Sequence, residues 1–432
     1  MESIKNAKTG DKLKLTTKDG STYTGILMPR SELADERHVV IKLDSGYNVG
    51  IDKDKITGIE LVLCSIPKEK FELKKTEPDK NKPKISILAT GGTIASRVDY
   101  ITGGVISAFS ADELISAVPE LEEIANVSGR QIFNKFSENI TPDDWAAIAD
   151  AVYEEIKKGA FGIVVTHGTD TMGYTAAALS FMLKTPVPVV ITGAQRSSDR
   201  GSSDAAVNLI NATAAAAKLK TGGVFVVMHG ESSDSFSLIH PGTKVKKLHS
   251  SRRDAFKTVN DFPAGKVENG GIEYFKNSNY YKEFIENQKN KNIELTLDNK
   301  LEKKVALIKY FPGMTPDVIE NLINSGYKGI IIEGTGLGHV NENLIGTLKK
   351  AVDNGIHVFM AIQTMHGRVN MRVYSTGRNL LNAGIVSCED MLSETALVKL
   401  MWVLGHTNEP EKVREMMRTN YAGEISRKSN IE

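Results

Sequence analysis

The stretch from Ile85 to Ser96 constrains the fold of this chain more than any other part of the sequence. It begins with an apolar run rich in β-branched residues, which is typical of a buried parallel strand. The run stops at Gly91-Gly92, and a glycine pair lets the backbone turn sharply and approach a ligand closely. The hydroxyl of Thr93 then lies at the carboxyl end of the strand, where open α/β sheets bind ligands. Backbone N–H groups in such a turn can hold a developing oxyanion, although an ordinary strand-to-helix turn fits the same tripeptide.

A second stretch repeats this arrangement. Residues 161–166 form another apolar strand pattern, which ends in His167-Gly168-Thr169-Asp170-Thr171. The two segments, ATGGTIAS and THGTDT, resemble the asparaginase/glutaminase family, whose active site uses two threonines from these two turns. Both motifs are long, occur in the family's order and follow a predicted strand. The resemblance covers about residues 85–432 and implies that Thr93 and Thr169 are catalytic.

Strand and helix patterns alternate from residue 85 onward, which predicts right-handed crossovers and a parallel sheet covered on both faces. Residues 271–302 are polar and rich in Asn and Lys, so we expect a subdomain boundary near residue 300. The predicted fold class is α/β, with two asparaginase-like parallel-sheet subdomains: a larger one over 85–300 with the catalytic threonines, and a smaller one over 301–432. Strands are predicted at 161–166, 187–192, 223–228, 305–310, 329–333 and 357–362, and helices at 110–117, 141–158, 171–184, 203–218, 316–324, 341–353, 390–404 and 409–419.

A small all-β domain is predicted before this core, over residues 1–66. Residues 12–17 alternate with a period of two, Lys18-Asp19-Gly20 is typical of a hairpin turn, and further short strands are expected at 23–28, 38–43 and 47–51. Four or five strands this short resemble the small barrels of Sm-like and SH3-like domains. Aromatic residues are few, which favours a docking or structural role over direct RNA binding. Residues 67–84 are rich in Lys, Glu and Pro and are predicted to be a solvated linker.

The composition and the cysteine positions indicate the compartment of the protein and the state of its thiols. The 54 basic and 53 acidic residues balance, so no overall charge favours nucleic acid or a membrane. No apolar run reaches the ~20 residues of a membrane span, and the first residues lack the apolar core of a secretory signal. Cys64 and Cys388 are far apart and lack metal-binding spacing. We therefore expect a cytoplasmic protein with free thiols and no metal.

Amide hydrolysis needs a nucleophile, a group that accepts its proton, and a site for the oxyanion. Thr93 and Thr169 supply hydroxyls, Asp170 supplies a carboxylate, and a lysine held close to them can take the proton. In the family, that lysine precedes a segment ending in Phe-Lys-x-Val-Asn. Counting back from this segment at 256–260 selects Lys247, with the neighbouring lysines at 244 and 246 as alternatives.

The family resemblance also implies substrate contacts. Ser137 and Glu138 match a family stretch that holds the α-carboxylate and α-amino groups of the substrate, although Glu138 could equally be a residue of a helix-entry loop. Tyr100 lies in a glycine-containing stretch and fits the family's mobile lid tyrosine. His167 is predicted to be structural, because the histidines form no metal-binding cluster.

The residues before position 85 suggest a branch of the family, because ordinary asparaginases begin near the first catalytic strand. A β-domain and a Lys-rich linker on an asparaginase core resemble the branch that serves archaeal tRNA-dependent amidotransferases. The resemblance implies that this chain releases ammonia from glutamine or asparagine and binds no cofactor itself. The E subunit of such an enzyme would use ATP and Mg to convert Glu-tRNA(Gln) into Gln-tRNA(Gln), contacting the tRNA, in a heterotetramer built on a homodimer of this chain. A free-standing cytosolic L-asparaginase is the alternative, and a scaffold without activity is a third possibility.

Overall fold

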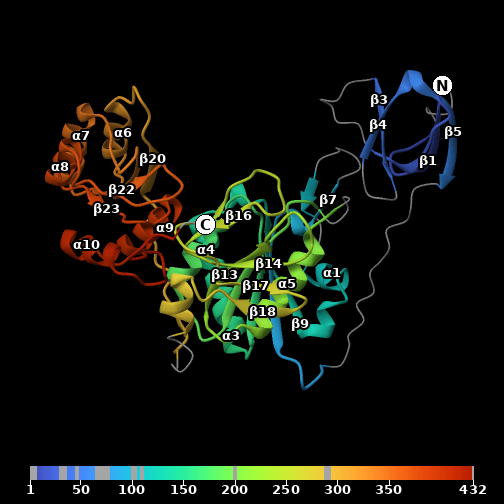
Figure 1. Ribbon diagram of the computed structural model, residues 1–432, viewed down its shortest axis with the longest axis horizontal. Helices are drawn as coiled ribbons and strands as arrows, with labels where there is room; N and C mark the ends of the chain where they lie inside the picture. Colours follow the sequence, from blue (N-terminus) through green and yellow to red (C-terminus); the bar gives the residue numbers. More distant parts are fainter. Residues whose placement is uncertain are drawn as a thin grey trace.

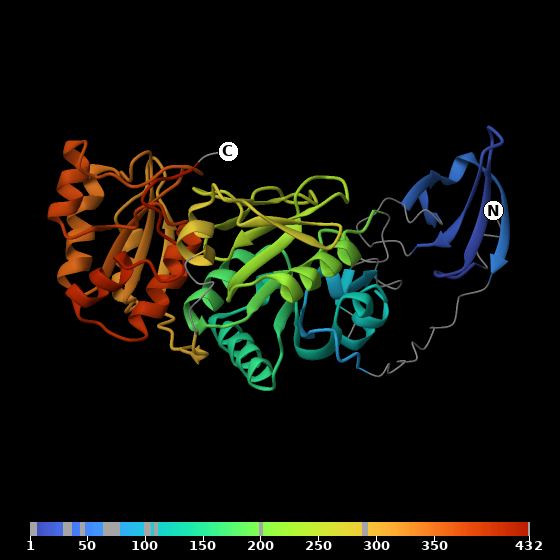
Figure 2. The same cartoon turned by 60° about the horizontal axis from the view of Figure 1, so that its bottom comes forward.

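The computed structural model describes residues 7–28, 37–43, 48–63, 78–98, 105–107, 111–197, 202–286 and 293–430. They form a small β-domain at one end of the molecule, a larger α/β subdomain in the middle and a smaller α/β subdomain at the other end (Figures 1 and 2). The predicted fold class is confirmed by this arrangement. None of the helices in these ranges is long and apolar enough to cross a membrane.

The N-terminal domain is a five-stranded antiparallel sheet with the order β4-β3-β2-β1-β5. Alternate residues of the strands point inward, as Leu13 and Leu15 do on β1, and they pack against Val39, Ile41 and Ile51. The predicted strands are confirmed to within a residue or two, and the hairpin turn follows β1 as expected. The strands are β1 (Lys12–Thr17), β2 (Thr22–Leu27), β3 (His38–Leu43), β4 (Asn48–Asp52) and β5 (Ile56–Leu63).

The larger subdomain is built on an eight-stranded sheet with the order β18-β17-β14-β13-β12-β10-β6-β9. Five neighbouring strands are parallel: β9 (Asn126–Lys135), β6 (Lys84–Gly91), β10 (Gly162–Thr166), β12 (Pro188–Thr192) and β13 (Gly223–His229). The remaining three strands are antiparallel, which the sequence analysis did not predict: β14 (Ser237–Pro241), β17 (Gly265–Glu268) and β18 (Gly271–Tyr274). The connections from β13 to β14 and from β17 to β18 are too short for a crossover helix, so the chain reverses direction there. The longer connection from β14 to β17 contains a separate two-stranded hairpin instead of a crossover helix.

Helices cover both faces of this sheet. On β10, Ile163 and Val165 face one hydrophobic cluster, whereas Val164 between them faces the other. The first cluster contains α3 (Pro142–Lys157) and α4 (Met172–Met182), and the second contains α1 (Ala111–Ser116), α2 (Leu121–Ile124) and α5 (Ala205–Lys218). Helix α3 begins as predicted, with a capping box between Thr141 and Asp144.

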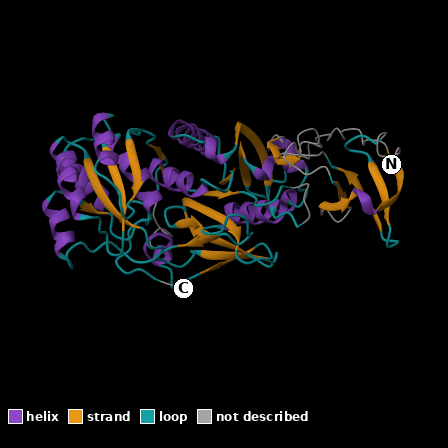
Figure 3. Ribbon diagram, turned by 90° about the horizontal axis from the view of Figure 1, so that it is seen from above, coloured by secondary structure: helices purple, strands orange, loops and turns teal. Residues whose placement is uncertain are grey.

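The smaller subdomain has a four-stranded parallel sheet formed by β20 (Val305–Lys309), β21 (Gly329–Gly334), β22 (His357–Ile362) and β23 (Val386–Ser387). One face is covered by α6 (Asp317–Asn324), α7 (Ile345–Asp353) and α8 (Ser375–Asn382), of which α8 was not predicted. On the other face, α9 (Ser393–Leu404) packs against α4, and α10 (Pro410–Arg418) packs against α9. One hydrophobic core therefore continues from the larger subdomain into the smaller one. Figure 3 shows the strands of the two subdomains with helices beside them.

Candidate active site

The two predicted threonine turns lie side by side at the carboxyl edge of the large sheet. Their strands, β6 and β10, are neighbours, and the Thr90 hydroxyl donates to the carbonyl of Thr166 at 2.8 Å. Gly92 has φ +80°, and a Cβ added there would lie 2.4 Å from the nitrogen of Gly168. Only glycine fits such a contact in a left-handed conformation. The two turns are thus packed backbone against backbone, and Thr93 begins a 3₁₀ turn (Thr93–Ala95) directly after this contact.

Ser137, which follows β9 on the other side of β6, packs against the second turn. It opens a 3₁₀ turn (Ser137–Asn139) just after β9, and a Cβ added to Gly168 would lie 2.7 Å from the Cβ of Ser137. The Thr171 hydroxyl donates to the Ser137 carbonyl at 2.7 Å. Ser137 is buried, whereas Glu138 is exposed. Ser137 therefore lies against the second threonine turn, and the Glu138 side chain is open to solvent.

Lys247 reaches this edge from a separate two-stranded hairpin, formed by β15 (Val245–Lys247) and β16 (Phe256–Thr258). Its Nζ donates to Thr169 Oγ1 and to Asp170 Oδ1, both at 2.8 Å. Thr169 is buried, while the side chain of Asp170 is 68% exposed. The Nζ atom of Lys247 therefore joins a buried hydroxyl to a carboxylate at the solvent boundary.

The two alternative lysines have other partners. Nζ of Lys244 lies 2.7 Å from Asp390 Oδ2, and Nζ of Lys246 lies 2.7 Å from Glu394 Oε1. Both carboxylates belong to the smaller subdomain. Of the three lysines, Lys247 is thus the one that contacts Thr169 and Asp170.

His167 is held in the turn as a buried imidazole. Its Nδ1 lies 2.6 Å from the Gly168 carbonyl and its Nε2 lies 2.8 Å from the Thr175 hydroxyl. Burial lowers the pKa of His167 to about 4, so the ring is neutral near pH 7. Among the described residues, no group of three or more His, Cys, Asp or Glu side chains is arranged to hold a metal ion.

Comparison with known proteins identifies the family. Residues 84–280 match the model of the asparaginase N-terminal domain, 304–417 that of the glutaminase/asparaginase C-terminal domain, and 7–62 that of the GatD N-terminal domain. The D subunit of glutamyl-tRNA(Gln) amidotransferase from Pyrococcus furiosus is 52% identical over 98% of this chain and 96% of its own length. The same subunit from Methanococcus maripaludis strain S2 is 51% identical over 98% of this chain and 99% of its own length. The chain belongs to the family of glutamyl-tRNA(Gln) amidotransferase D subunits.

Solved asparaginases match the D-subunit chain over a smaller share of its length. The thermostable L-asparaginase from Thermococcus kodakarensis is 34% identical, with a TM-score of 0.70, and covers 79% of this chain and 99% of its own. A probable cytoplasmic L-asparaginase from Campylobacter jejuni is 29% identical, with a TM-score of 0.65, over 78% and 99%. Members of the D-subunit family align over nearly the whole chain, and so the free-standing asparaginase is the less supported alternative.

The residues that fasten the lysine hairpin to the smaller subdomain of the D-subunit chain are not evident from its sequence. The sequence predicts Lys244 and Lys246 only as alternatives to Lys247, and it indicates no site role for Asp390 or Glu394. Their pairing joins residues about 146 positions apart, which no local pattern reveals. The predicted lid residue, Tyr100, lies outside the described residues.

Proposed function

We propose that this chain hydrolyses the side-chain amide of glutamine or asparagine at the edge formed by Thr93, Thr169, Asp170 and Lys247. The proposal depends above all on the paired contacts of the Lys247 Nζ atom with Thr169 and Asp170. A lysine between a hydroxyl and a carboxylate can move a proton from the first while being oriented by the second. Membership of an asparaginase-type family supports the same reaction.

In the proposed mechanism, the oxygen of Thr93 attacks the amide carbon and its proton passes to the Thr169–Lys247 unit. The negative charge that develops on the amide oxygen would be stabilised by backbone N–H groups of the glycine turns. Breakage of the C–N bond releases ammonia, which carries away the transferred proton. Water then hydrolyses the threonine ester to give the free acid and restore the hydroxyl. Ser137 and Glu138 would bind the α-carboxylate and α-amino groups, and Tyr100 would close over the substrate.

The ammonia would be used by a second subunit. The D-subunit relatives bear the name of an amidotransferase, and similarity to them continues through the N-terminal β-domain. We propose that an E subunit binds Glu-tRNA(Gln), uses ATP and Mg to activate it, and amidates it in the cytoplasm. The complex would be a heterotetramer containing two copies of this chain, which itself binds no cofactor.

Steady-state ammonia release tests the two parts of the proposal. We expect slow hydrolysis of glutamine by the chain alone and faster hydrolysis when the E subunit and Glu-tRNA(Gln) are both present. Removal of residues 1–80 should weaken this activation more than it changes the basal rate. If the full-length and the truncated chain release ammonia at equal rates, with or without the E subunit and the tRNA, the free-standing asparaginase would be favoured.

A Thr93→Val variant separates ammonia production from ammonia use. It should fold and release no ammonia from glutamine, while a high ammonium concentration restores amidation of the tRNA by the assembled complex. Hydrolysis of glutamine at a rate near that of the wild type would exclude Thr93 as the nucleophile. Failure of ammonium rescue in an intact complex would show that the threonine has a further role.

A further inference from the structure

The hairpin that carries Lys247 is not part of the large sheet. Strand β15 pairs only with β16 in the part of the chain that the structure describes, through three residue pairs from Val245↔Thr258 to Lys247↔Phe256. A two-stranded hairpin is marginally stable by itself. The position of the Lys247 side chain must therefore be set by what the hairpin packs against.

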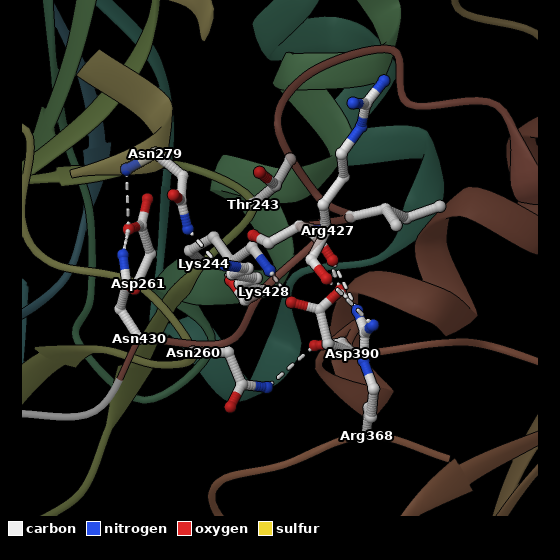
Figure 4. Close-up of polar contacts among 12 residues, drawn as sticks. Thr243, Lys244, Asn260, Asp261, Asn279, Arg368, Asp390, Arg427, Lys428 and Asn430 are labelled. Atoms are coloured by element: carbon white, nitrogen blue, oxygen red, sulfur yellow. Dashed lines mark hydrogen bonds and ion pairs between the residues drawn. The ribbon is translucent and has the colours of Figure 1, made fainter. Parts of the chain in front are cut away.

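Lys244, three residues before Lys247, fastens this hairpin to the smaller subdomain. Its ammonium group lies 2.7 Å from Asp390 Oδ2, and the two side chains are 1% and 0% exposed (Figure 4). The other oxygen of Asp390 accepts the backbone N–H of Ser426 at 2.9 Å and lies 3.7 Å from a guanidinium nitrogen of Arg368. Both carboxylate oxygens are thus occupied, and Asp390 is fixed from two sides.

Three further contacts hold both ends of the hairpin to the same region. The Thr395 hydroxyl donates to the carbonyl of Thr243 at 2.9 Å, and the Thr243 hydroxyl donates to the carbonyl of Ala422 at 3.0 Å. Beyond β16, the Asn260 amide donates to the carbonyl of Asp390 at 2.9 Å (Figure 4). Asn260 has φ +60°, a conformation that asparagine tolerates better than most residues.

We infer that Lys244 and Asp390 are positioning residues for Lys247, so that the smaller subdomain sets the geometry of a site whose hydroxyls lie in the larger one. The inference rests on the proposed function, because it gives Lys247 the role stated there. A buried ion pair is weak evidence for stability, since desolvation offsets much of the attraction. The role of the Lys244–Asp390 pair is better explained by the position it gives to Lys247, because a displacement of about 1 Å at a catalytic group can reduce the rate about 100-fold.

A second buried pair provides a matched control. Lys399 and Glu424 are both 0% exposed, and their charged atoms lie 2.6 Å apart. Lys399 also donates to the carbonyls of Met417 and Thr419, so its hydrogen bonds are with the C-terminal segment. This pair reaches the hairpin only indirectly, through Ala422. It has the burial and charge of the Lys244–Asp390 pair without its connection to Lys247.

The test compares kcat and KM for amide hydrolysis in full-length Lys244→Met, Asp390→Asn and Lys399→Met variants, each corrected for the folded fraction. We expect kcat to fall about 10- to 100-fold in the first two, with KM changed by less than about threefold, because the defect concerns the proton-transfer group. Lys399→Met should reduce stability while leaving kcat within about threefold of wild type. If single variants fail to fold, Lys244→Met/Asp390→Leu, which removes both charges of the buried pair, should fold and show the same loss.

A double variant distinguishes this inference from the proposed function. If Lys244 acts through Lys247, adding Lys244→Met to Lys247→Met should cause no further loss of the residual rate. A folded Lys244→Met or Lys244→Met/Asp390→Leu protein with wild-type kcat would overturn the inference, as would equal losses in Lys399→Met. Full activity of Lys247→Met would instead overturn the role of the lysine in the proposed function.

Discussion

The hydroxyl half and the lysine half of the candidate site are held by different kinds of contact. Thr93 and Thr169 follow adjacent parallel strands, and the turns that carry them touch through Gly92 and Gly168. Lys247 lies on a hairpin outside the large sheet. Val245 and Phe256 anchor this hairpin in the shared core, and ion pairs and hydrogen bonds join it to the smaller subdomain. The backbone of the sheet determines one half of the site, whereas buried polar contacts determine the other.

This difference predicts how each half fails. The hydroxyl half tolerates almost no added volume, because its turns are already in van der Waals contact. The lysine half depends on groups that are individually replaceable but cannot be left charged and unpaired in the interior. Added volume in the first half should therefore damage both fold and activity, while changes in the second half should reduce activity without unfolding the protein.

Within the lysine half, the largest effect is expected at Lys247, where the two halves meet. Lys247→Met removes the group that contacts both Thr169 and Asp170, and kcat should fall about 100- to 10,000-fold, the usual contribution of a positioned acid–base group. Asp170→Asn should also reduce kcat severely. The Lys247→Met/Asp170→Asn double variant should have a kcat only slightly lower than either single variant, because the effects of residues that act as a unit are not additive. Initial-rate ammonia assays measure these losses.

Lys257→Met is the matched control for that variant. Lys257 is opposite Lys246 on β16, and its partner is Asp254 at 4.0 Å, outside the threonine turns. Its loss should leave kcat within about threefold, as for most surface substitutions. Losses in Lys247→Met and Asp170→Asn that simply multiply in the double variant would argue against a shared proton path.

The same contrast explains what the sequence could predict. The β6 and β10 turns consist of short motifs on strongly apolar strands, so both threonines and their neighbourhood were predicted from local pattern. The antiparallel strands β14, β17 and β18 are not predicted, because strands of four or five residues are too short to show a clear periodicity. The partners of Lys244 and Lys246 lie on another subdomain, and no local pattern connects positions so far apart. Helix α8 was missed because only Gly377 and Leu380 are buried in it.

In the hydroxyl half, Gly92→Ala should be the most damaging small substitution. The new Cβ would collide with the backbone of Gly168 and impose a left-handed conformation on alanine. Overpacking and the unfavourable φ together should lower the free energy of unfolding by about 2–5 kcal/mol and abolish ammonia release. Urea denaturation measures the first effect.

Gly159→Ala isolates the packing contribution. Gly159 has a similar φ of +87°, but a Cβ there meets nothing within 4 Å. It should therefore show only the conformational cost, about 1–2 kcal/mol, and keep its activity. Equal destabilisation by the two substitutions would mean that the contact between the turns contributes little.

A buried neutral histidine lies beside each half of the site, and it makes the stability of the protein depend on pH. Burial lowers the pKa of His167 to about 4. The Nδ1 atom of His240 lies 2.8 Å from the Thr258 hydroxyl of the hairpin. Burial, and to a smaller extent the charge of Lys257, lowers the pKa of His240 to about 3. Below pH 6.5 the two histidines become protonated in the unfolded chain but stay neutral in the folded protein. The free energy of unfolding therefore falls as the pH falls. At pH 4.5 each histidine should reduce the free energy of unfolding by about 2 kcal/mol relative to pH 7.

His167→Gln and His240→Gln should each lose less stability than the wild type between these pH values. His249→Gln is the control, because His249 lies on the exposed part of the loop between the two hairpin strands. Urea midpoints at pH 7 and 4.5 give the comparison. An unchanged pH dependence in His167→Gln would mean that this ring is not kept neutral by the fold.

The smallest effect is expected at the second ion pair of the lysine half, between Lys246 and Glu394. Its side chains are 27% and 21% exposed, so water screens the attraction, and Glu394→Gln should cost at most about 1 kcal/mol. Successive residues of a strand point to opposite faces, so Lys246 faces the smaller subdomain while Lys247 faces the threonine turn. Loss of the pair should therefore reduce kcat no more than about threefold, far less than loss of the buried Lys244–Asp390 pair. Glu268→Gln, which breaks a solvent-exposed pair with Lys266 on β17, gives the baseline for both stability and kcat. A tenfold loss in Glu394→Gln would place the main support of the hairpin at Lys246 and not at the buried pair.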